Sequence, residues 1–334
     1  MATDWIDHCA FNGDADGLCA LQQLRLAGEL SDCVRLVSGV KRDIGLLRRV
    51  LAGRGERVTV LDISHTQNRD DTQRLLEGGA RLRYFDHHHA GEVPQHPAFE
   101  SYIDTAANVC TSILVDRYLQ GRHYRWAVAA AFGDGMAGPA RALAERHGLA
   151  AGEVAALEEL GLLLNYNAYG DSLADLHFDP VALAAELLPY SDPLEFALHS
   201  PSFVRLRAGY AEDMVAAQGQ QPWREGPGAL LYRLPAEAWS RRVSGVLANQ
   251  LAVAEPSRVI GLLSAKSGGG WSFSLRVPAG TGMPADEFCR GFATGGGRAR
   301  AAGINHLDDD GLDQLADRLL SGYPRAVAQQ EMQR

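Results

Sequence analysis

The first half of the chain alternates between short apolar runs and segments with helical spacing of apolar residues. The apolar runs are rich in β-branched and aliphatic residues, which favours strands, and they occupy residues 7–11, 34–38, 58–63 and 81–85. Helices are expected between them, around residues 18–24, at 41–51 and at 69–77. Strand–helix alternation of this kind predicts βαβ units built around a parallel sheet.

The second half has a different pattern. Residues 153–219 have mainly helical spacing, and the Gln, Pro and Gly residues between 220 and 228 indicate a boundary. Shorter strands and helices follow. The sequence therefore predicts an α/β protein, with a doubly wound, mainly parallel sheet over residues 1–190. A helical linker over 191–225 leads to a smaller α/β domain over 226–334.

Composition and charge narrow the function classes. The chain has 334 residues, of which 46% are hydrophobic and 22% charged, enough to form a core and inconsistent with wholesale disorder. The net charge of −9 argues against a general binder of long nucleic acid. Residues 226–334 carry 12 Lys and Arg against 10 Asp and Glu, whereas the preceding residues carry 20 against 31. This is either ordinary scatter, or an acidic half that collects cations beside a half that binds anions.

The sequence also bears on location. The first 13 residues have neither a basic nor an apolar region of a signal peptide, and no apolar run approaches the roughly 20 residues that span a bilayer. The cysteines form no CxxC pair and lie at Cys9, Cys19, Cys33, Cys110 and Cys289. We therefore expect a cytoplasmic protein without a membrane partner or a disulfide framework. A homodimer is compatible with the sequence, which contains no heptad repeat.

Polar motifs follow several of the expected strands. NGDADG (12–17) follows the first strand, Asp62 lies near the end of the third, and Asp86, His87 and His88 follow the fourth. FGDGM (132–136) ends an expected helix. Each motif alone has an ordinary explanation as a turn or a helix cap. Because the carboxyl ends of parallel strands lie at one edge of a sheet, we expect the motifs to meet there.

Four carboxylates and one imidazole would then converge, from Asp14, Asp16, Asp62, Asp134 and His87. Without a cation, the carboxylates would repel one another and some would take up protons. Two divalent ions would offset their charge. Mixed oxygen and nitrogen ligands favour Mn²⁺, with Mg²⁺ as the alternative, whereas zinc prefers fewer ligands and often thiolates. Such a pair of ions can activate a water and stabilise an in-line displacement at phosphorus.

This ordered set of motifs resembles the DHH phosphoesterases that carry a C-terminal DHHA1 domain. DADG, Asp62, the Asp86-His87-His88 run and Asp134 match the motifs of the DHH domain. SLR (274–276) and GGGRARAAG (295–303) are similar to the DHHA1 substrate-binding signature. The resemblance covers nearly the whole chain. It implies a metal-binding catalytic domain over 1–190 and a substrate-binding domain over 226–334.

The resemblance also implies roles for individual residues. The first ion would be held by Asp14 and Asp62, and the second by Asp16, Asp62, His87 and Asp134, so that Asp62 bridges both. Many members of the family have a histidine where this chain has Asn12, whose amide oxygen is a poorer ligand for the first ion. Asp62, Asp86 and His88 would be the catalytic residues.

In that scheme Asp86 orients His87, and His88 contacts a phosphate oxygen or assists the leaving group. The expected substrate-binding residues are Arg276, Arg298, Gly295, Gly296 and Gly297. Arg298 stands where the common pattern has histidine. An arginine suits this role because its planar fork can donate two hydrogen bonds to a phosphate.

Several weaker candidates accompany these residues. Lys41 and Arg42 open an expected helix whose N–H groups could receive a phosphate, or are solvated charges. Thr111 and Ser112 are expected to cap a helix. The polar segment 165–171 is a candidate lining of the site, and His89 is expected to be structural.

We therefore expect a Mn²⁺-dependent phosphohydrolase. Its substrates would be short oligonucleotides, dinucleotides or 3′-phosphorylated nucleotides, and the short acidic chain does not suit processive digestion of long strands. An exopolyphosphatase-like hydrolase is the enzymatic alternative, since polyphosphate needs the same ions and arginines. A catalytically weak nucleotide sensor is the other alternative, prompted by Asn12.

Overall fold

The computed structural model describes residues 5–323, which divide into two compact units between Gly209 and Tyr210. The division falls inside helix α9 (Pro201–Gln218).

The first unit is built on a five-stranded sheet in which every pairing is parallel. Its strands are β1 (Ile6–Phe11), β2 (Arg35–Val37), β3 (Glu56–Leu61), β4 (Arg81–Asp86) and β5 (Phe99–Ile103). They lie in the order β2-β1-β3-β4-β5, so the chain reverses its direction across the sheet between β1 and β3. Ligands of open α/β sheets bind beyond the strand ends at such a reversal. The predicted α/β class is confirmed.

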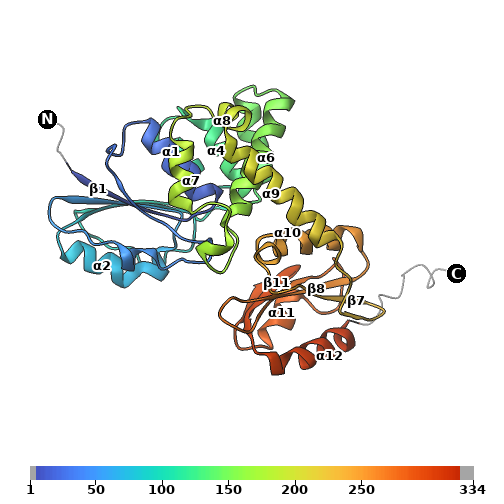
Figure 1. The fold of residues 1–334 in the computed structure, drawn as a ribbon. Helices are drawn as coiled ribbons and strands as arrows, with labels where there is room; N and C mark the ends of the chain where they lie inside the picture. The colour runs from blue at the N-terminus through green and yellow to red at the C-terminus, as the bar shows by residue number, and fades with distance from the viewer. Residues whose placement is uncertain (1–4, 324–334) are drawn as a thin grey trace. The chain divides into compact units, whose positions relative to one another are not determined.

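Helices cover both faces of this sheet, with α2 on one side and α1 and α7 on the other (Figure 1). The helices of the unit are α1 (Ala15–Leu26), α2 (Arg69–Glu77), α3 (Thr111–Tyr118), α4 (Tyr124–Gly133), α5 (Ala137–Arg146), α6 (Ala151–Ala168), α7 (Pro180–Leu187), α8 (Pro193–His199) and most of α9. Helices α4 and α6 pack very closely, because a Cβ atom at Gly161 would lie 2.0 Å from the carbonyl oxygen of Ala129. This contact fixes α4, whose end reaches the strand ends.

The prediction of a helix over residues 41–51 is wrong. The segment contains a 3₁₀ turn at Leu46–Arg49, and Gly45 before it is not in a helical conformation. Leu46 and Leu47 are fully buried against β3 and α2, and burying a leucine contributes about 1.5–3 kcal/mol. A short turn, rather than a helix, therefore buries the apolar residues that suggested an amphipathic helix.

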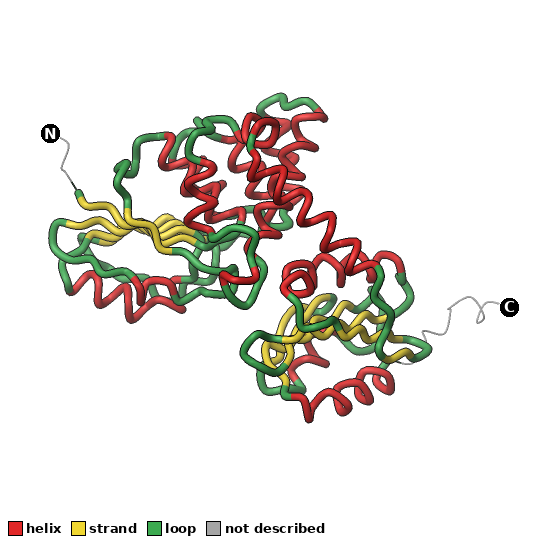
Figure 2. The backbone as a smooth tube through the Cα atoms, in the orientation of Figure 1, coloured by secondary structure: helices red, strands yellow, loops and turns green. Residues whose placement is uncertain are grey.

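The second unit contains a six-stranded mixed sheet, of order β10-β11-β9-β8-β7-β6, in which only β7 and β8 pair in parallel. Its strands are β6 (Arg224–Glu225), β7 (Ala229–Arg233), β8 (Val259–Ala265), β9 (Trp271–Arg276), β10 (Gly295–Arg298) and β11 (Ala301–Leu307). Helix α10 (Ala238–Ala254) covers one face, and α11 (Ala285–Arg290) and α12 (Leu312–Gly322) cover the other (Figure 2). The glycine-rich motif therefore forms the edge hairpin β10–β11. Among residues 5–323, no helix is long and apolar enough to cross a membrane.

Candidate metal centre

Five of the expected side chains come together at the point where the strand order reverses. Asp14 and Asp16 lie at the start of α1, directly after β1, and Asp62 follows β3. His87 follows β4, and Asp134 follows the last residue of α4. Asp14, Asp16 and Asp62 are almost fully buried. The cluster therefore concentrates negative charge where the fold places ligands.

The turn after β1 is shaped by its own side chains. Asp14 Oδ1 accepts hydrogen bonds from the backbone N–H groups of Asp16 (3.0 Å) and Gly17 (3.1 Å), which caps α1. The amide oxygen of Asn12 accepts from the N–H of Asp14 at 3.3 Å. A Cβ atom at Gly17 would lie 2.1 Å from the Asn12 carbonyl oxygen, so only glycine fits this tight turn.

The start of α3 holds Asp16 in place. The backbone N–H groups of Thr111 and Ser112 each donate to an Asp16 carboxylate oxygen at 2.7 Å. The N-terminus of a helix favours a carboxylate in this position. Thr111 and Ser112 were expected only to cap a helix, but Cys110 takes the N-cap position of α3, and their contact with Asp16 was not predicted. Their position at a helix start was the available signal.

Asp62 has a strained backbone, with a φ of +59°. Non-glycine residues rarely adopt this conformation, and it is retained most often at functional sites. Its Oδ1 accepts a hydrogen bond of 3.0 Å from the Thr111 hydroxyl. Burial, and then the charges of Asp14 and Asp16, raise the pKa of Asp62 well above its ordinary value.

His87 presents its Nε2 atom to the carboxylates. Its Nδ1 lies 3.0 Å from the carbonyl oxygen of Val109, which can only accept, so Nδ1 donates this hydrogen bond and Nε2 is the ring atom that a metal would use. Its Nε2 faces three carboxylates, at 3.4 Å from Asp62 Oδ1, 3.7 Å from Asp134 Oδ2 and 4.0 Å from Asp16 Oδ2. A cation between these groups would satisfy all of them.

Asp86 does not orient His87 as the resemblance implied. Its Oδ1 lies 2.7 Å from His88 Nδ1, and the Val109 carbonyl takes the partner position on His87. The two rings contact each other edge to face, with their centroids 4.5 Å apart, and of the two it is the ring of His88 that bonds to the buried Asp86 carboxylate. That hydrogen bond, acting against burial, raises the pKa of His88.

The ligand types suit a divalent cation. Ligand atoms of Asp16, His87 and Asp134 lie within 4.8 Å of one another, and so do those of Asp62, His87 and His88. Carboxylate oxygens with one imidazole nitrogen are compatible with Mn²⁺ or Mg²⁺. The residues at the strand ends therefore fit a metal ion.

Without metal, the carboxylates should make stability depend on pH. Burial, and then Asp16, raise the pKa of Asp134 from 3.8 to about 6. Between these values the folded protein binds more protons than the unfolded chain, so stability falls as the pH rises. The raised pKa of Asp62 acts in the same direction. We expect the Tm of metal-free protein to be lower at about pH 7.5 than at about pH 5.5, and Mn²⁺ to raise it at the higher pH.

Asp116 on α3 provides a control for this measurement. Burial raises the pKa of Asp116 to about 6 as well, so it contributes with the same sign from outside the centre. In an Asp116→Asn background the remaining pH dependence should still respond to Mn²⁺. A metal-free Tm that stays level or rises between the two pH values would contradict the charge arrangement.

The second unit has a cavity with a positive lining. It has a volume of about 480 Å³, and arginines from β9 and from the β10–β11 turn, Arg276 and Arg300, line it. Arg276 donates through Nε to Asn249 Oδ1 at 2.7 Å, which sets the direction of its guanidinium group. Arg298 pairs with Ala301 across the hairpin and is not among the side chains that line the cavity. Gly295–Arg298 form β10 itself.

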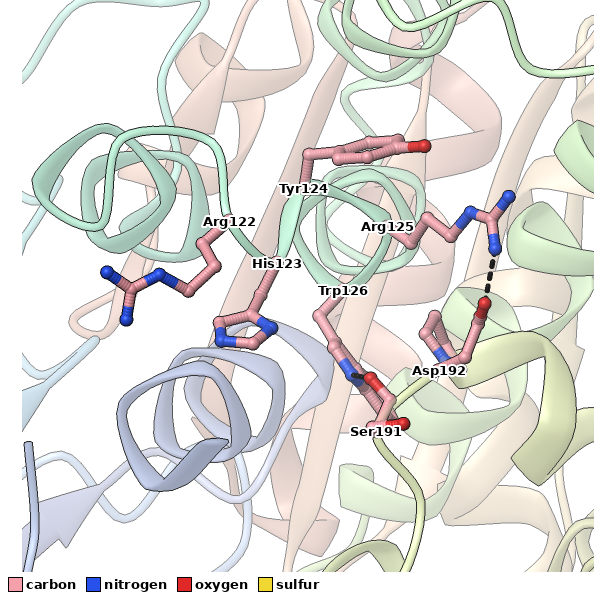
Figure 3. Close-up of a pocket in the computed structure, with 8 residues that line it drawn as sticks. Arg122, His123, Tyr124, Arg125, Trp126, Ser191 and Asp192 are labelled. Atoms are coloured by element: carbon pink, nitrogen blue, oxygen red, sulfur yellow. Dashed lines mark hydrogen bonds and ion pairs between the residues drawn. The ribbon is translucent and has the colours of Figure 1, made fainter. Parts of the chain in front are cut away.

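Another cavity, of about 400 Å³, lies at the start of α4 in the first unit (Figure 3). Arg125 on its wall forms ion pairs with Asp192 and with Glu153. Trp126 Nε1 donates to the Ser191 carbonyl at 3.0 Å. These contacts tie the start of α4 to the start of α8, so we assign this wall a structural role in holding the helix that precedes Asp134.

No protein-family model and no curated protein matches the chain. Solved structures do. An exonuclease RecJ bound to manganese is 18% identical with a TM-score of 0.60, covering 96% of this chain and 92% of the other. The pGpG-specific phosphodiesterase PggH from Vibrio cholerae is 14% identical with a TM-score of 0.56, covering 95% and 98%. An exopolyphosphatase-related protein from Bacteroides fragilis is 13% identical with a TM-score of 0.51, covering 96% and 93%.

These three proteins belong to the DHH/DHHA1 superfamily. The chain shares its fold with these three proteins. The resemblance first seen in the motifs is therefore confirmed at the level of the fold and over both units. In this fold the residues of the four N-terminal motifs meet beyond the ends of β1, β3 and β4, with Asp134 joining them from the end of α4.

Proposed function

We propose that the chain is a divalent-metal-dependent phosphoesterase that hydrolyses phosphoester or phosphodiester bonds in small nucleotide substrates. The observation that carries this proposal is the Nε2 atom of His87, which faces three carboxylates at the strand reversal of a DHH/DHHA1 fold. Asp16, Asp62, His87 and Asp134 would hold the metal. Bound there, a divalent ion such as Mn²⁺ would polarise the phosphoryl oxygen and lower the pKa of a water nucleophile.

His88 is placed to act on the substrate. Asp86 holds its Nδ1, which leaves Nε2 directed away from the buried carboxylate, and 45% of the side chain is exposed. The raised pKa keeps this imidazole protonated to a higher pH than usual. We infer that His88 Nε2 donates its proton to a phosphate oxygen or to the leaving group.

The second unit supports a small anionic substrate. Two arginines in a cavity of about 480 Å³ can hold one terminal phosphate with several hydrogen bonds. The net charge of −9 disfavours long polyanions. We therefore propose dinucleotides, very short oligonucleotides and 3′-phosphorylated nucleotides as the substrate class. The fold shared with a pGpG-specific phosphodiesterase supports this choice.

Release of phosphate or nucleoside monophosphate from a substrate panel tests the proposal. The panel contains pGpG and other dinucleotides, five-nucleotide RNA and DNA, adenosine 3′,5′-bisphosphate and polyphosphate, each with Mn²⁺, Mg²⁺ or EDTA. We expect metal-dependent release from dinucleotides, short oligonucleotides or the bisphosphate, and none from Asp62→Asn. Silence on the whole panel by protein that binds metal would refute the proposal.

Polyphosphate is the second candidate substrate, because a structural neighbour is an exopolyphosphatase-related protein and paired arginines also suit a phosphate chain. Turnover of polyphosphate without turnover of any nucleotide would establish it. Tight nucleotide binding without metal-stimulated turnover would instead indicate a sensor.

A further inference from the structure

The centre contains a cation of its own, the ammonium group of Lys41. Its Nζ lies 2.6 Å from Asp14 Oδ2, 3.0 Å from Asn165 Oδ1 and 3.5 Å from Asp134 Oδ1. An ammonium has three N–H donors, and these three acceptors match them. Only 23% of the Lys41 side chain is exposed. The three N–H donors of the Lys41 ammonium therefore have their acceptors inside the centre.

The surroundings of Lys41 hold it there. Its backbone N–H donates to the Ala168 carbonyl at the end of α6 at 2.9 Å, and the ring of Tyr169 lies 5.6 Å from Nζ. Asn165 belongs to the same helix. Lysine is rare in this chain, which has two lysines among 32 basic residues. An ammonium is a compact charge that fits an ion-sized space, whereas a guanidinium is a wide planar fork.

Asp14 is occupied by the chain itself. Its Oδ1 accepts from two backbone N–H groups, and its Oδ2 contacts the Lys41 ammonium at a distance that leaves no room for an ion between them. The amide oxygen of Asn12 accepts from the Asp14 N–H. Asp14 and Asn12 are the residues expected to bind the first ion and not the second. Both already have partners in the protein.

The ligands of the second ion are arranged differently. His87 Nε2 lies 3.4–4.0 Å from three carboxylates, and the ligand atoms of Asp16, His87 and Asp134 lie within 4.8 Å of one another. One ion fits among them. Lys41 and one divalent ion together carry three positive charges against four carboxylates, and Lys41 with two divalent ions would carry five, so the charge count leaves an imbalance of one in either case. Because Lys41 already holds Asp14, the geometry therefore favours one ion, among Asp16, His87 and Asp134.

We propose that the Lys41 ammonium takes the place of the first divalent ion and that the centre binds a single divalent cation, at Asp16, Asp62, His87 and Asp134. This inference relies on the proposed function only for the existence of a metal centre. It replaces the two ions expected from the sequence with one ion and one fixed ammonium. The ammonium would contribute a permanent charge that does not depend on metal concentration.

Counting ions in the full-length protein tests the inference. Isothermal titration with Mn²⁺ should give one ion per chain, and electron paramagnetic resonance should show the hyperfine pattern of an isolated Mn²⁺. Lys41→Met keeps the length of the side chain, removes its charge and frees Asp14. We expect this variant to bind two ions, with the broadened spectrum of neighbouring, exchange-coupled spins. Lys266→Met, which changes the only other lysine, is the matched control and should bind one ion.

Each outcome decides the matter. Two coupled ions in the wild-type protein would overturn the inference, and so would a folded Lys41→Met variant that still binds one. If Lys41→Met does not fold, the wild-type stoichiometry and spectrum decide alone. One ion in a protein that hydrolyses nothing refutes the proposed function and leaves the single-ion site standing. Two ions in an active enzyme would overturn the single-ion site and leave the proposed function standing. A protein that binds no ion would overturn both.

Discussion

Asp62→Asn is expected to abolish turnover and, in the metal-free protein, to raise the Tm. Asp62 lies among Asp14, Asp16 and Asp134, and its pKa is raised well above the ordinary value by burial and by these charges. An asparagine keeps the shape and tolerates a φ of +59°, but brings no charge to the cluster. The loss of activity should exceed the about 10–100-fold that follows from altering groups behind a metal ligand.

Asp62→Asn is expected to lower the activity but to raise the stability of the metal-free protein. Relief of repulsion worth about 1 kcal/mol would raise the Tm by about 2–4 °C in a unit of this size. The measurement is thermal unfolding in EDTA, paired with Mn²⁺ titration and turnover. Asp116→Asn, a buried carboxylate outside the centre, is the control and should retain activity. An Asp62→Asn protein that is both less stable without metal and still active would show that Asp62 supports the fold rather than the chemistry.

The sequence predicted elements well where one local pattern decides them. Helix α2 spans Arg69–Glu77, the range expected from its spacing, and β1 and β4 differ from expectation by a residue. The edge strand β5 was missed because its residues are partly exposed and form no apolar run. At 41–51 the pattern was misleading, because a turn buries Leu46 and Leu47 as well as a helix would.

The candidate site was predictable to the extent that topology decides it. Parallel strands carry their carboxyl ends to one edge, so Asp14, Asp62 and His87 could be brought together from sequence alone. The hydrogen-bond partners of these residues could not be predicted. The partner of His87, for example, is the Val109 carbonyl, a backbone group that no side-chain pattern marks. Lys41 was recognised as a candidate, but its contact with Asp14 depends on a loop that was expected to be helical.

The second large effect is expected at Arg300 rather than at Arg298. The backbone around Arg300 is fixed, because the Val277 N–H donates to the Arg300 carbonyl at 3.0 Å and the Ala285 N–H donates to the Ala299 carbonyl at 2.8 Å. Arg300 lines the cavity together with Arg276, whereas Arg298 lies beyond Ala301 on the exposed edge strand. Hydrogen bonds to a charged group contribute about 1.5–3 kcal/mol, so Arg300→Ala should raise KM about 10–100-fold.

Two further arginine variants separate the loss of a phosphate contact from the general effect of removing a positive charge. Arg298→Ala removes the same charge two residues earlier in the chain, from a side chain that does not line the cavity, and we expect a change in KM of less than about threefold. Arg290→Ala, on the exposed face of α11, should change nothing. None of the three should alter Mn²⁺ affinity, because the metal ligands belong to the first unit. A larger effect of Arg298→Ala than of Arg300→Ala would return the phosphate contact to the residue that the motif suggested and would place the substrate over the edge hairpin.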